Sequence, residues 1–299
     1  MNLLITGAFD WTQSELNKLC ELGHRIHFMQ NEKDILPCEA EWVEGIVGNG
    51  IFLYHSIEHF QNLKYVQLTS AGFDRVPITY IKEHNIKIFN ARGVYSIPMA
   101  EFALCGVLQL YKQCSFFEVN QQNHCWKKHR GLLELYKKSV CIIGCGSVGN
   151  ECAKRFRCFG CNVVGVDIKP YKSDLYEEMF SLEELDCALS RADIAVLTLP
   201  LTEKTHNLIN SGRLAIMKSN SILVNIARGA IVDTNALITA VNKNIIGGAV
   251  LDVFSDEPLP ANSLLWDLDN VIITPHNSFV SEGNHNRMLD VIMNNLKGL

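Results

Sequence analysis

The stretch from Val140 to Asp167 constrains the fold of this chain more than any other part of it. An apolar run at 140–143, typical of a buried strand, leads into a turn with three glycines, Gly144-Cys145-Gly146-Ser147-Val148-Gly149. Apolar residues then recur every three or four positions up to Gly160, which predicts a helix, and a second apolar run ends in Asp167. This order of strand, glycine turn, helix and strand predicts a βαβ unit in a parallel sheet.

The three glycines have separate predicted tasks. Gly144 allows a tight turn where the strand ends, Gly146 lets a diphosphate approach the backbone, and Gly149 lets the helix pack closely on the strand. The free N–H groups and the positive end of the helix dipole then face the phosphates. An ordinary glycine-rich turn is the alternative, but the acid that ends the next strand argues against it.

Asp167 predicts which dinucleotide binds. It lies eighteen residues past Gly149, close to the spacing of the carboxylate that accepts hydrogen bonds from a ribose 2′-OH. Because a carboxylate repels a 2′-phosphate, the sequence favours NAD over NADP. Lys169 and Lys172 lie nearby, so the strictness of this preference stays open.

Bulk composition limits the class of protein. At 299 residues, two domains are expected. A net charge of −5 gives no reason to expect a nucleic-acid or membrane partner, and the cluster 127–130 is read as a solvated basic patch. No apolar run reaches transmembrane length, and the N-terminus has no secretion-signal pattern.

The eleven cysteines indicate a reducing compartment. Cys105, Cys141 and Cys152 lie in predicted strands or on apolar helix faces, which suits buried thiols in a cytoplasmic protein better than a disulfide framework. Cys158 and Cys161 have the spacing of a zinc half-site or redox pair, but no second pair accompanies them. No metal is expected.

The first part of the chain predicts a small α/β domain. Short apolar runs alternate with helical or turn segments, at 2–6, 25–29, 45–47, 65–68 and 86–89, with a helix at 12–22. The loop at 69–74 follows a strand end, and the small residues Ala71 and Gly72 leave N–H groups free for an anion; a plain turn is an equal alternative. Arg92 is read as a surface arginine, with contact to a substrate acid as the alternative.

A long apolar helix is predicted from Ser96, as its cap, to about Gln113, and an irregular segment anchored by Trp126 is predicted from 114 to 138. Beyond Asp167 the alternation resumes. Ser181 and Asp233 are expected helix caps, and further strands are expected at 194–199, 222–226, 248–253 and 271–274. The second domain is thus predicted as a doubly wound sheet over 97–275.

Three polar residues follow late strands of that sheet: Arg228, Glu257 and His276. Singly, each has an ordinary structural explanation as a salt-bridge arginine, a turn acid or a strand-end histidine. Together they match hydride transfer to a ketone, since a guanidinium can orient a substrate carboxylate and polarise its carbonyl. The histidine can protonate the forming alkoxide, and the glutamate can hold the imidazolium.

Over nearly its whole length the chain resembles the D-isomer-specific 2-hydroxyacid dehydrogenases, a family that includes glyoxylate/hydroxypyruvate reductases and phosphoglycerate dehydrogenases. The resemblance rests on several motifs in the right order: Ser70-Ala71-Gly72, the glycine turn with Asp167, Leu199-Pro200-Leu201-Thr202, Asn225-Ile226-Ala227-Arg228-Gly229, Leu251-Asp252-Val253 through Glu257-Pro258, and Thr274-Pro275-His276.

The resemblance implies a role for each matching residue. Arg228, Glu257 and His276 would be catalytic, and Arg228, Ala71 and Gly72 would bind the substrate carboxylate. Asp252 would meet the nicotinamide carboxamide. The implied NAD contacts are Gly144, Gly146, Ser147, Val148, Gly149, Asp167, Pro200, Thr205, Ala227 and Asp252.

The resemblance also implies an architecture: a Rossmann doubly wound NAD-binding domain at 97–275 and a smaller flavodoxin-like α/β substrate domain at 1–96 and 276–299. A C-terminal helix at 283–297 would return to the first domain, and the helix after Ser96 with the segment following it would form a homodimer contact. The chain ends 23 residues after His276, so the C-terminal regulatory domains of some phosphoglycerate dehydrogenases are expected to be absent.

The function implied is an NAD-dependent hydride transfer between nicotinamide and a small D-2-hydroxy acid or 2-keto acid. An NAD-sensing corepressor-like binding protein on the same fold is the alternative, because such relatives keep the catalytic residues. The side chain of the substrate and the physiological direction stay open, since the pocket is built from loops of the first domain.

Overall fold

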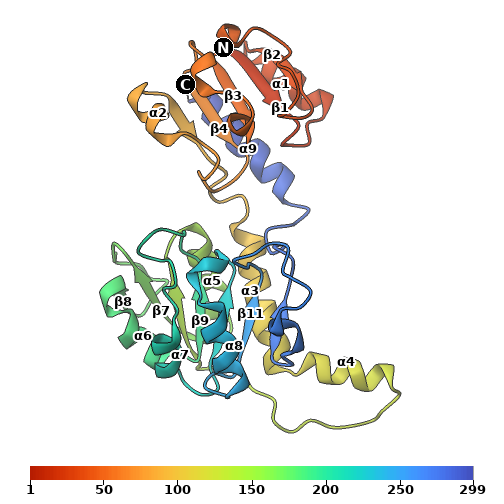
Figure 1. Cartoon of the computed structure of the whole chain (residues 1–299), viewed down its shortest axis with the longest axis vertical. Helices are drawn as coiled ribbons and strands as arrows, with labels where there is room; N and C mark the ends of the chain where they lie inside the picture. The colour runs from red at the N-terminus through yellow and green to blue at the C-terminus, as the bar shows by residue number, and fades with distance from the viewer. Residues whose placement is uncertain (299) are drawn as a thin grey trace. The chain divides into compact units, whose positions relative to one another are not determined.

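The structure is a computed structural model that describes residues 1–298. The chain folds into two compact units, one formed by Met1–Tyr95 together with the chain from Ser281, and one formed by Ser96–Val280. Figure 1 shows a sheet in each.

The first unit contains a parallel five-stranded sheet in the order β2-β1-β3-β4-β5, which is the flavodoxin-like order. Its strands are β1 (Asn2–Thr6), β2 (Arg25–Met29), β3 (Gly45–Gly48), β4 (Tyr65–Leu68) and β5 (Lys87–Phe89), and its helices are α1 (Gln13–Glu21), α2 (Ile78–Glu83) and α9 (Asn284–Lys297).

Helix α9 belongs to this unit because one of its faces is apolar. Met288, Ile292 and Leu296, spaced four apart, are buried in one core cluster with Leu3 and Leu19. A second cluster, which includes Ile81 of α2, fills the other side of the sheet. Helices and loops therefore cover both faces.

The second unit contains a parallel seven-stranded sheet in the order β8-β7-β6-β9-β10-β11-β12. This is the doubly wound order, with the switch point between β6 and β9. Its strands are β6 (Ser139–Ile143), β7 (Asn162–Asp167), β8 (Met179–Ser181), β9 (Ile194–Leu197), β10 (Ile222–Asn225), β11 (Gly248–Leu251) and β12 (Val271–Ile273).

Helices cover this sheet on both faces, each over its own core. One core contains α3 (Ser96–Tyr111) and α5 (Ser147–Cys158). The other contains α6 (Leu185–Arg191), α7 (Ser211–Ile216) and α8 (Thr234–Asn242). The predicted Rossmann-type sheet with a smaller α/β unit is confirmed.

The segment predicted as irregular contains a helix, α4 (Cys114–Gln122), and this prediction was wrong. None of the residues of α4 is buried, so this helix packs no apolar face onto the core of its unit. Trp126 is 96% exposed and does not anchor the segment within the unit.

Among the cysteines predicted to be buried, Cys141 and Cys152 are buried but Cys105 is exposed. Cys105 lies on the one side of α3 that does not face the sheet core. The expected caps Ser181 and Asp233 are confirmed, whereas Ser96 is the first residue of α3 and not a cap preceding it.

Candidate functional site

The glycine turn has the backbone shape that a diphosphate requires. Gly144 has φ = +98°, and a Cβ there would lie 2.6 Å from the Leu199 nitrogen. A Cβ on Gly149 would overlap the Gly144 carbonyl oxygen, so these two positions need glycine. At Gly146 a Cβ would meet nothing within 4 Å, which leaves the space beside the turn open.

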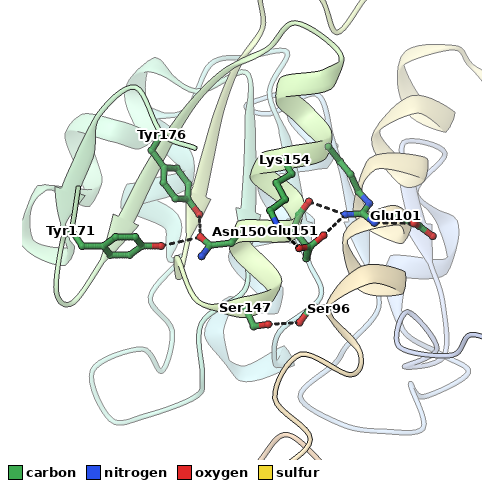
Figure 2. A network of polar contacts seen from close by, with 9 residues as sticks. Ser96, Glu101, Ser147, Asn150, Glu151, Lys154, Tyr171 and Tyr176 are labelled. Carbon is green, nitrogen blue, oxygen red and sulfur yellow. Dashed lines mark hydrogen bonds and ion pairs between the residues drawn. The ribbon is translucent and has the colours of Figure 1, made fainter. Parts of the chain in front are cut away.

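Helix α5 begins in this open space without a side-chain cap. Gly146 is its N-cap residue and has no side chain to bond the first N–H groups. The Ser147 hydroxyl is hydrogen-bonded to the Ser96 hydroxyl (Figure 2), and the two oxygens are 2.7 Å apart. Uncapped N–H groups, a positive helix end and free space fit the diphosphate of a dinucleotide.

Asp167 ends β7 beside the same turn. Its Oδ2 accepts the Cys145 N–H at 2.8 Å, and its Oδ1 accepts the Lys169 N–H at 3.1 Å. Each carboxylate oxygen can accept a second hydrogen bond. The side chain is therefore oriented by the backbone and keeps the capacity to accept ribose hydroxyls.

Pro200 and Thr205 lie after β9, the strand across the switch point from β6. The Thr205 hydroxyl donates to the Pro200 carbonyl at 2.8 Å and accepts the Thr202 N–H at 2.7 Å. Thr205 is 1% exposed, so it shapes this loop from inside. Its predicted contact with NAD stays a prediction.

Asp252 follows β11 and holds the segment that contains His276. Its carboxylate accepts hydrogen bonds from the Thr274 hydroxyl at 2.6 Å and from the N–H groups of Asn277 at 2.8 Å and Ser278 at 3.0 Å. Its carbonyl accepts the His276 N–H at 2.8 Å. The side chain is fully buried in this arrangement, and its contact with the nicotinamide carboxamide stays a prediction.

Glu257 and His276 form a hydrogen-bonded pair. His276 Nδ1 lies 2.8 Å from Glu257 Oε2, and the second carboxylate oxygen, Oε1, accepts the Phe254 N–H at 2.9 Å. Both side chains are partly exposed, at 43% and 36%. When Nδ1–H is donated to Glu257, Nε2 is the ring atom that remains for proton exchange.

Arg228 follows β10, the neighbour of β11 in the sheet. Its Nη1 donates to the Ala227 carbonyl at 2.7 Å, and its own carbonyl accepts the Asn225 amide at 3.0 Å. Asn225 also accepts the Ala227 N–H at 3.1 Å, so this buried amide fixes the whole turn. Because β10, β11 and β12 are adjacent and parallel, Arg228, Glu257 and His276 follow the same edge of the sheet.

Ala71 and Gly72 lie in the first unit, after β4. Asn90 donates to the Ala71 carbonyl at 2.7 Å, and Ala91 donates to the Ser70 carbonyl at 2.9 Å, so the strand-end segment after β5 braces this loop. Within residues 1–298 the N–H groups of Ala71 and Gly72 donate to no protein group. This fits their predicted task of binding a carboxylate.

The two cysteines with metal-site spacing have different surroundings. Cys158 is exposed, whereas Cys161 is buried and its thiol donates to the Leu135 carbonyl at 3.2 Å. Burial raises the pKa of Cys161 to about 11. Among the described residues no group of three or more His, Cys, Asp and Glu side chains could hold a metal ion.

Two residues of the turn's surroundings were missed by the sequence reasoning, Asn150 and Tyr171. The Tyr171 hydroxyl contacts both the Asn150 side chain and the Cys145 carbonyl of the glycine turn. They belong to different elements, and no local pattern joins them.

None of the helices in the described part of the chain has the length and apolarity to cross a membrane.

A family model described as the NAD binding domain of D-isomer specific 2-hydroxyacid dehydrogenases matches residues 104–278. The chain is 33% identical to a glyoxylate reductase of Thermofilum pendens, over 79% of this chain and 71% of that protein. It is 34% identical to a D-lactate dehydrogenase of Treponema pallidum, over 74% of this chain and 70% of that protein.

The fold is also similar to that of solved structures. The D-lactate dehydrogenase of Aquifex aeolicus, complexed with NAD and lactic acid, has a TM-score of 0.78 and 26% sequence identity. The alignment covers 99% of this chain and 96% of that structure.

Proposed function

Because the chain belongs to the family of D-isomer specific 2-hydroxyacid dehydrogenases, we propose that it reduces a small 2-keto acid to the D-2-hydroxy acid. The chain is an NAD-dependent oxidoreductase that transfers a hydride between nicotinamide and a hydroxy or keto acid. The proposal extends this to the direction, the product configuration and the residues that act.

The Glu257–His276 pair carries the proposal. A histidine held at Nδ1 by a carboxylate presents Nε2 in a fixed tautomer, which is the arrangement that a general acid or base requires. The pair follows strands β11 and β12, at the carboxyl edge of the same sheet that bears the glycine turn. Ligands of open α/β sheets bind at this edge.

In the proposed reaction, bound NADH supplies the hydride. The Arg228 guanidinium binds the substrate carboxylate and polarises the adjacent carbonyl. His276 gives its Nε2 proton to the carbonyl oxygen as the C–O double bond becomes single, so that a hydroxyl group forms. Glu257 stabilises the imidazolium before this transfer and keeps Nδ1 protonated after it. In the reverse direction neutral His276 accepts the hydroxyl proton.

We propose that Ala71 and Gly72 bind a substrate carboxylate through their N–H groups, and that the remaining matched residues bind NAD. The open space at Gly146 and the oriented Asp167 carboxylate support the second assignment. The unit Ser96–Val280 would then bind the cofactor and contribute Arg228, Glu257 and His276, and the other unit would contribute Ala71 and Gly72.

We propose a homodimer through α3, α4 and the chain that follows α4. Helix α4 extends away from the sheet of its unit in Figure 1 and has no buried residue. Apolar side chains nevertheless gather on this segment: Phe117, Val119, Trp126 and Leu132. A second copy of the chain would cover them.

The cytoplasm is the proposed location. All eleven cysteines are free thiols, which is typical of proteins in a reducing compartment. The alternative function, an NAD-sensing corepressor-like protein, is not favoured, because the relatives compared above are named as a reductase and as dehydrogenases.

His276→Ala tests the proposed function. Turnover of the best 2-keto acid should fall at least about 100-fold, because the proton donor is lost. The Kd for NADH, from quenching of protein fluorescence, should stay within about twofold, since the variant leaves the glycine turn intact. The control is His59→Ala, an exposed histidine of the first unit. Full turnover by His276→Ala would exclude His276 as the acid.

A further inference from the structure

Cys145, the residue between the first two glycines of the turn, is hydrogen-bonded through both of its backbone groups to the chain that follows β7. Its N–H donates to Asp167 Oδ2 at 2.8 Å. Its carbonyl accepts the Tyr171 hydroxyl at 2.8 Å. The peptide groups before and after Cys145 are thus held by the side chains of Asp167 and Tyr171, which lie four residues apart in the sequence.

The Tyr171 hydroxyl also contacts the helix that follows the turn. It lies 2.9 Å from Asn150 Oδ1, and the Tyr176 hydroxyl lies 2.7 Å from the same oxygen (Figure 2). A hydroxyl has one proton, so Tyr171 shares it between the Cys145 carbonyl and Asn150. Tyr176 is buried whereas Tyr171 is 39% exposed, so the Tyr171 ring is the one at the surface of the site.

The contact with the Cys145 carbonyl has a consequence for Gly146. In a trans peptide the carbonyl of one residue and the N–H of the next point in opposite directions. Tyr171 therefore holds the Gly146 N–H pointing away from itself. Within the described residues this N–H donates to no group, and the space around Gly146 is open. The Gly146 N–H is consequently fixed as a donor for a ligand.

We propose that Tyr171 is a cofactor-positioning residue, which orients the Cys145–Gly146 peptide group so that its N–H binds the diphosphate of NAD. This rests on the role of the glycine turn as the NAD site, and not on the proposed 2-keto acid. In this proposal the Asp167 carboxylate accepts hydrogen bonds from the ribose hydroxyls, whereas Tyr171 orients the N–H group that binds the diphosphate. The diphosphate is common to NADH and NADPH, whereas the ribose 2′ position differs between them.

This division of tasks predicts two different signatures. Tyr171→Phe removes one oxygen and keeps the ring, and it should raise the Kd values of NADH and NADPH by the same factor, about fivefold, as expected for one hydrogen bond. Asp167→Ala should instead change the ratio of the two Kd values. The turnover number of Tyr171→Phe at saturating NADH should stay within about twofold of the wild type, because the acid pair is untouched.

Two control variants separate positioning from general stability. Tyr176→Phe removes the other hydroxyl on Asn150 but leaves the Cys145 carbonyl bonded, so the Kd for NADH should not change. Tyr136→Phe alters a tyrosine of the same unit that is 63% exposed and has no hydrogen bond through its hydroxyl within residues 1–298. Melting temperatures of all three variants without cofactor report on stability.

The Kd values are measured by titrating the substrate-free protein with NADH and NADPH and following fluorescence. The proposal is supported if only Tyr171→Phe weakens both cofactors equally. It is overturned if the Kd values of Tyr171→Phe are unchanged, if only one cofactor is weakened, or if Tyr176→Phe weakens NADH as much. Because no substrate is present, this result is independent of whether any 2-keto acid is reduced.

Discussion

The backbone of His276 has φ = +50°, in the left-handed region that residues other than glycine rarely occupy. Such a conformation costs about 1–3 kcal/mol and persists only where the surroundings hold it. Asp252 provides that support. Its carbonyl accepts the His276 N–H, and its carboxylate accepts hydrogen bonds from the Thr274 hydroxyl and the Asn277 N–H. The proposed proton donor is therefore held by a buried acid as well as by Glu257.

At the same scale, we propose that Asp167 decides between the two dinucleotides. Asp167→Ala should raise the Kd for NADH about tenfold, because charge-assisted hydrogen bonds to the ribose are lost. The Kd for NADPH should rise less or fall, since the charge that repels a 2′-phosphate is gone.

Asp167→Asn separates charge from shape, because its amide oxygen can still accept the Cys145 N–H. It should relax the selection against NADPH while preserving the turn. An unchanged ratio of the two Kd values in both variants would contradict the assignment of Asp167 to the ribose.

At the scale of elements, the sequence predicted those parts whose signals are local. The capping box at Ser181 and the cap at Asp233 depend on residues three positions away, and both are present. Strand β8 was missed because it has three residues, only one of them buried. Helix α4 was missed because it begins after Gln113 with no side-chain cap and buries nothing.

The candidate site shows the same limit. The strand-end positions of Arg228, Glu257 and His276 could be predicted, because parallel strands bring their carboxyl ends to one edge. The contact of Tyr171 with Cys145 joins residues 26 positions apart through a side chain on an irregular loop. No periodicity or spacing predicts such a contact.

The junction of α1 and α9 makes the stability of the first unit depend on pH. His285 of α9 lies 2.7 Å from Glu15 of α1. Burial alone would raise the pKa of Glu15, but hydrogen bonds from His285 and Thr12 outweigh it and lower the pKa below its ordinary value of 4.5. This carboxylate therefore stabilises the fold above its unfolded-state pKa, and the contribution is lost as the pH falls through the lowered value.

Glu15→Gln should accordingly destabilise the protein at pH 7 by about 1 kcal/mol, a loss of roughly 2–4 °C in melting temperature. The difference from the wild type should shrink in acid, where Glu15 is protonated in both states. Glu21→Gln, at the exposed end of α1, is the matched control. A difference that is the same at neutral and acid pH would contradict the account.

At the scale of the whole molecule, each unit is a parallel sheet with buried clusters on both faces. Large apolar side chains are nevertheless left exposed in the second unit, and several of them lie on α4 and in the chain that follows it. The proposed dimer explains them, because association would remove their apolar surface from water.

Trp126→Ser combined with Val119→Ser should shift the protein from dimer to monomer in sedimentation velocity, with the far-UV circular dichroism spectrum unchanged. Both side chains are more than half exposed in the single chain, at 96% and 54%, so the fold itself should tolerate the change. Tyr54→Ser, at a 59% exposed residue of the first unit, is the control. A wild-type protein that sediments as a monomer would remove the proposed dimer.

We propose above that this molecule uses NADH to reduce a 2-keto acid to the D-2-hydroxy acid. The most direct test follows NADH oxidation by the wild-type protein with glyoxylate, pyruvate, hydroxypyruvate and longer 2-keto acids, and determines the configuration of each chiral product. We expect turnover of at least one of these acids, with one D-2-hydroxy acid formed for each NADH consumed. Oxidation of NADH no faster than in the His276→Ala variant with every acid, or a product of L configuration, would contradict the claim.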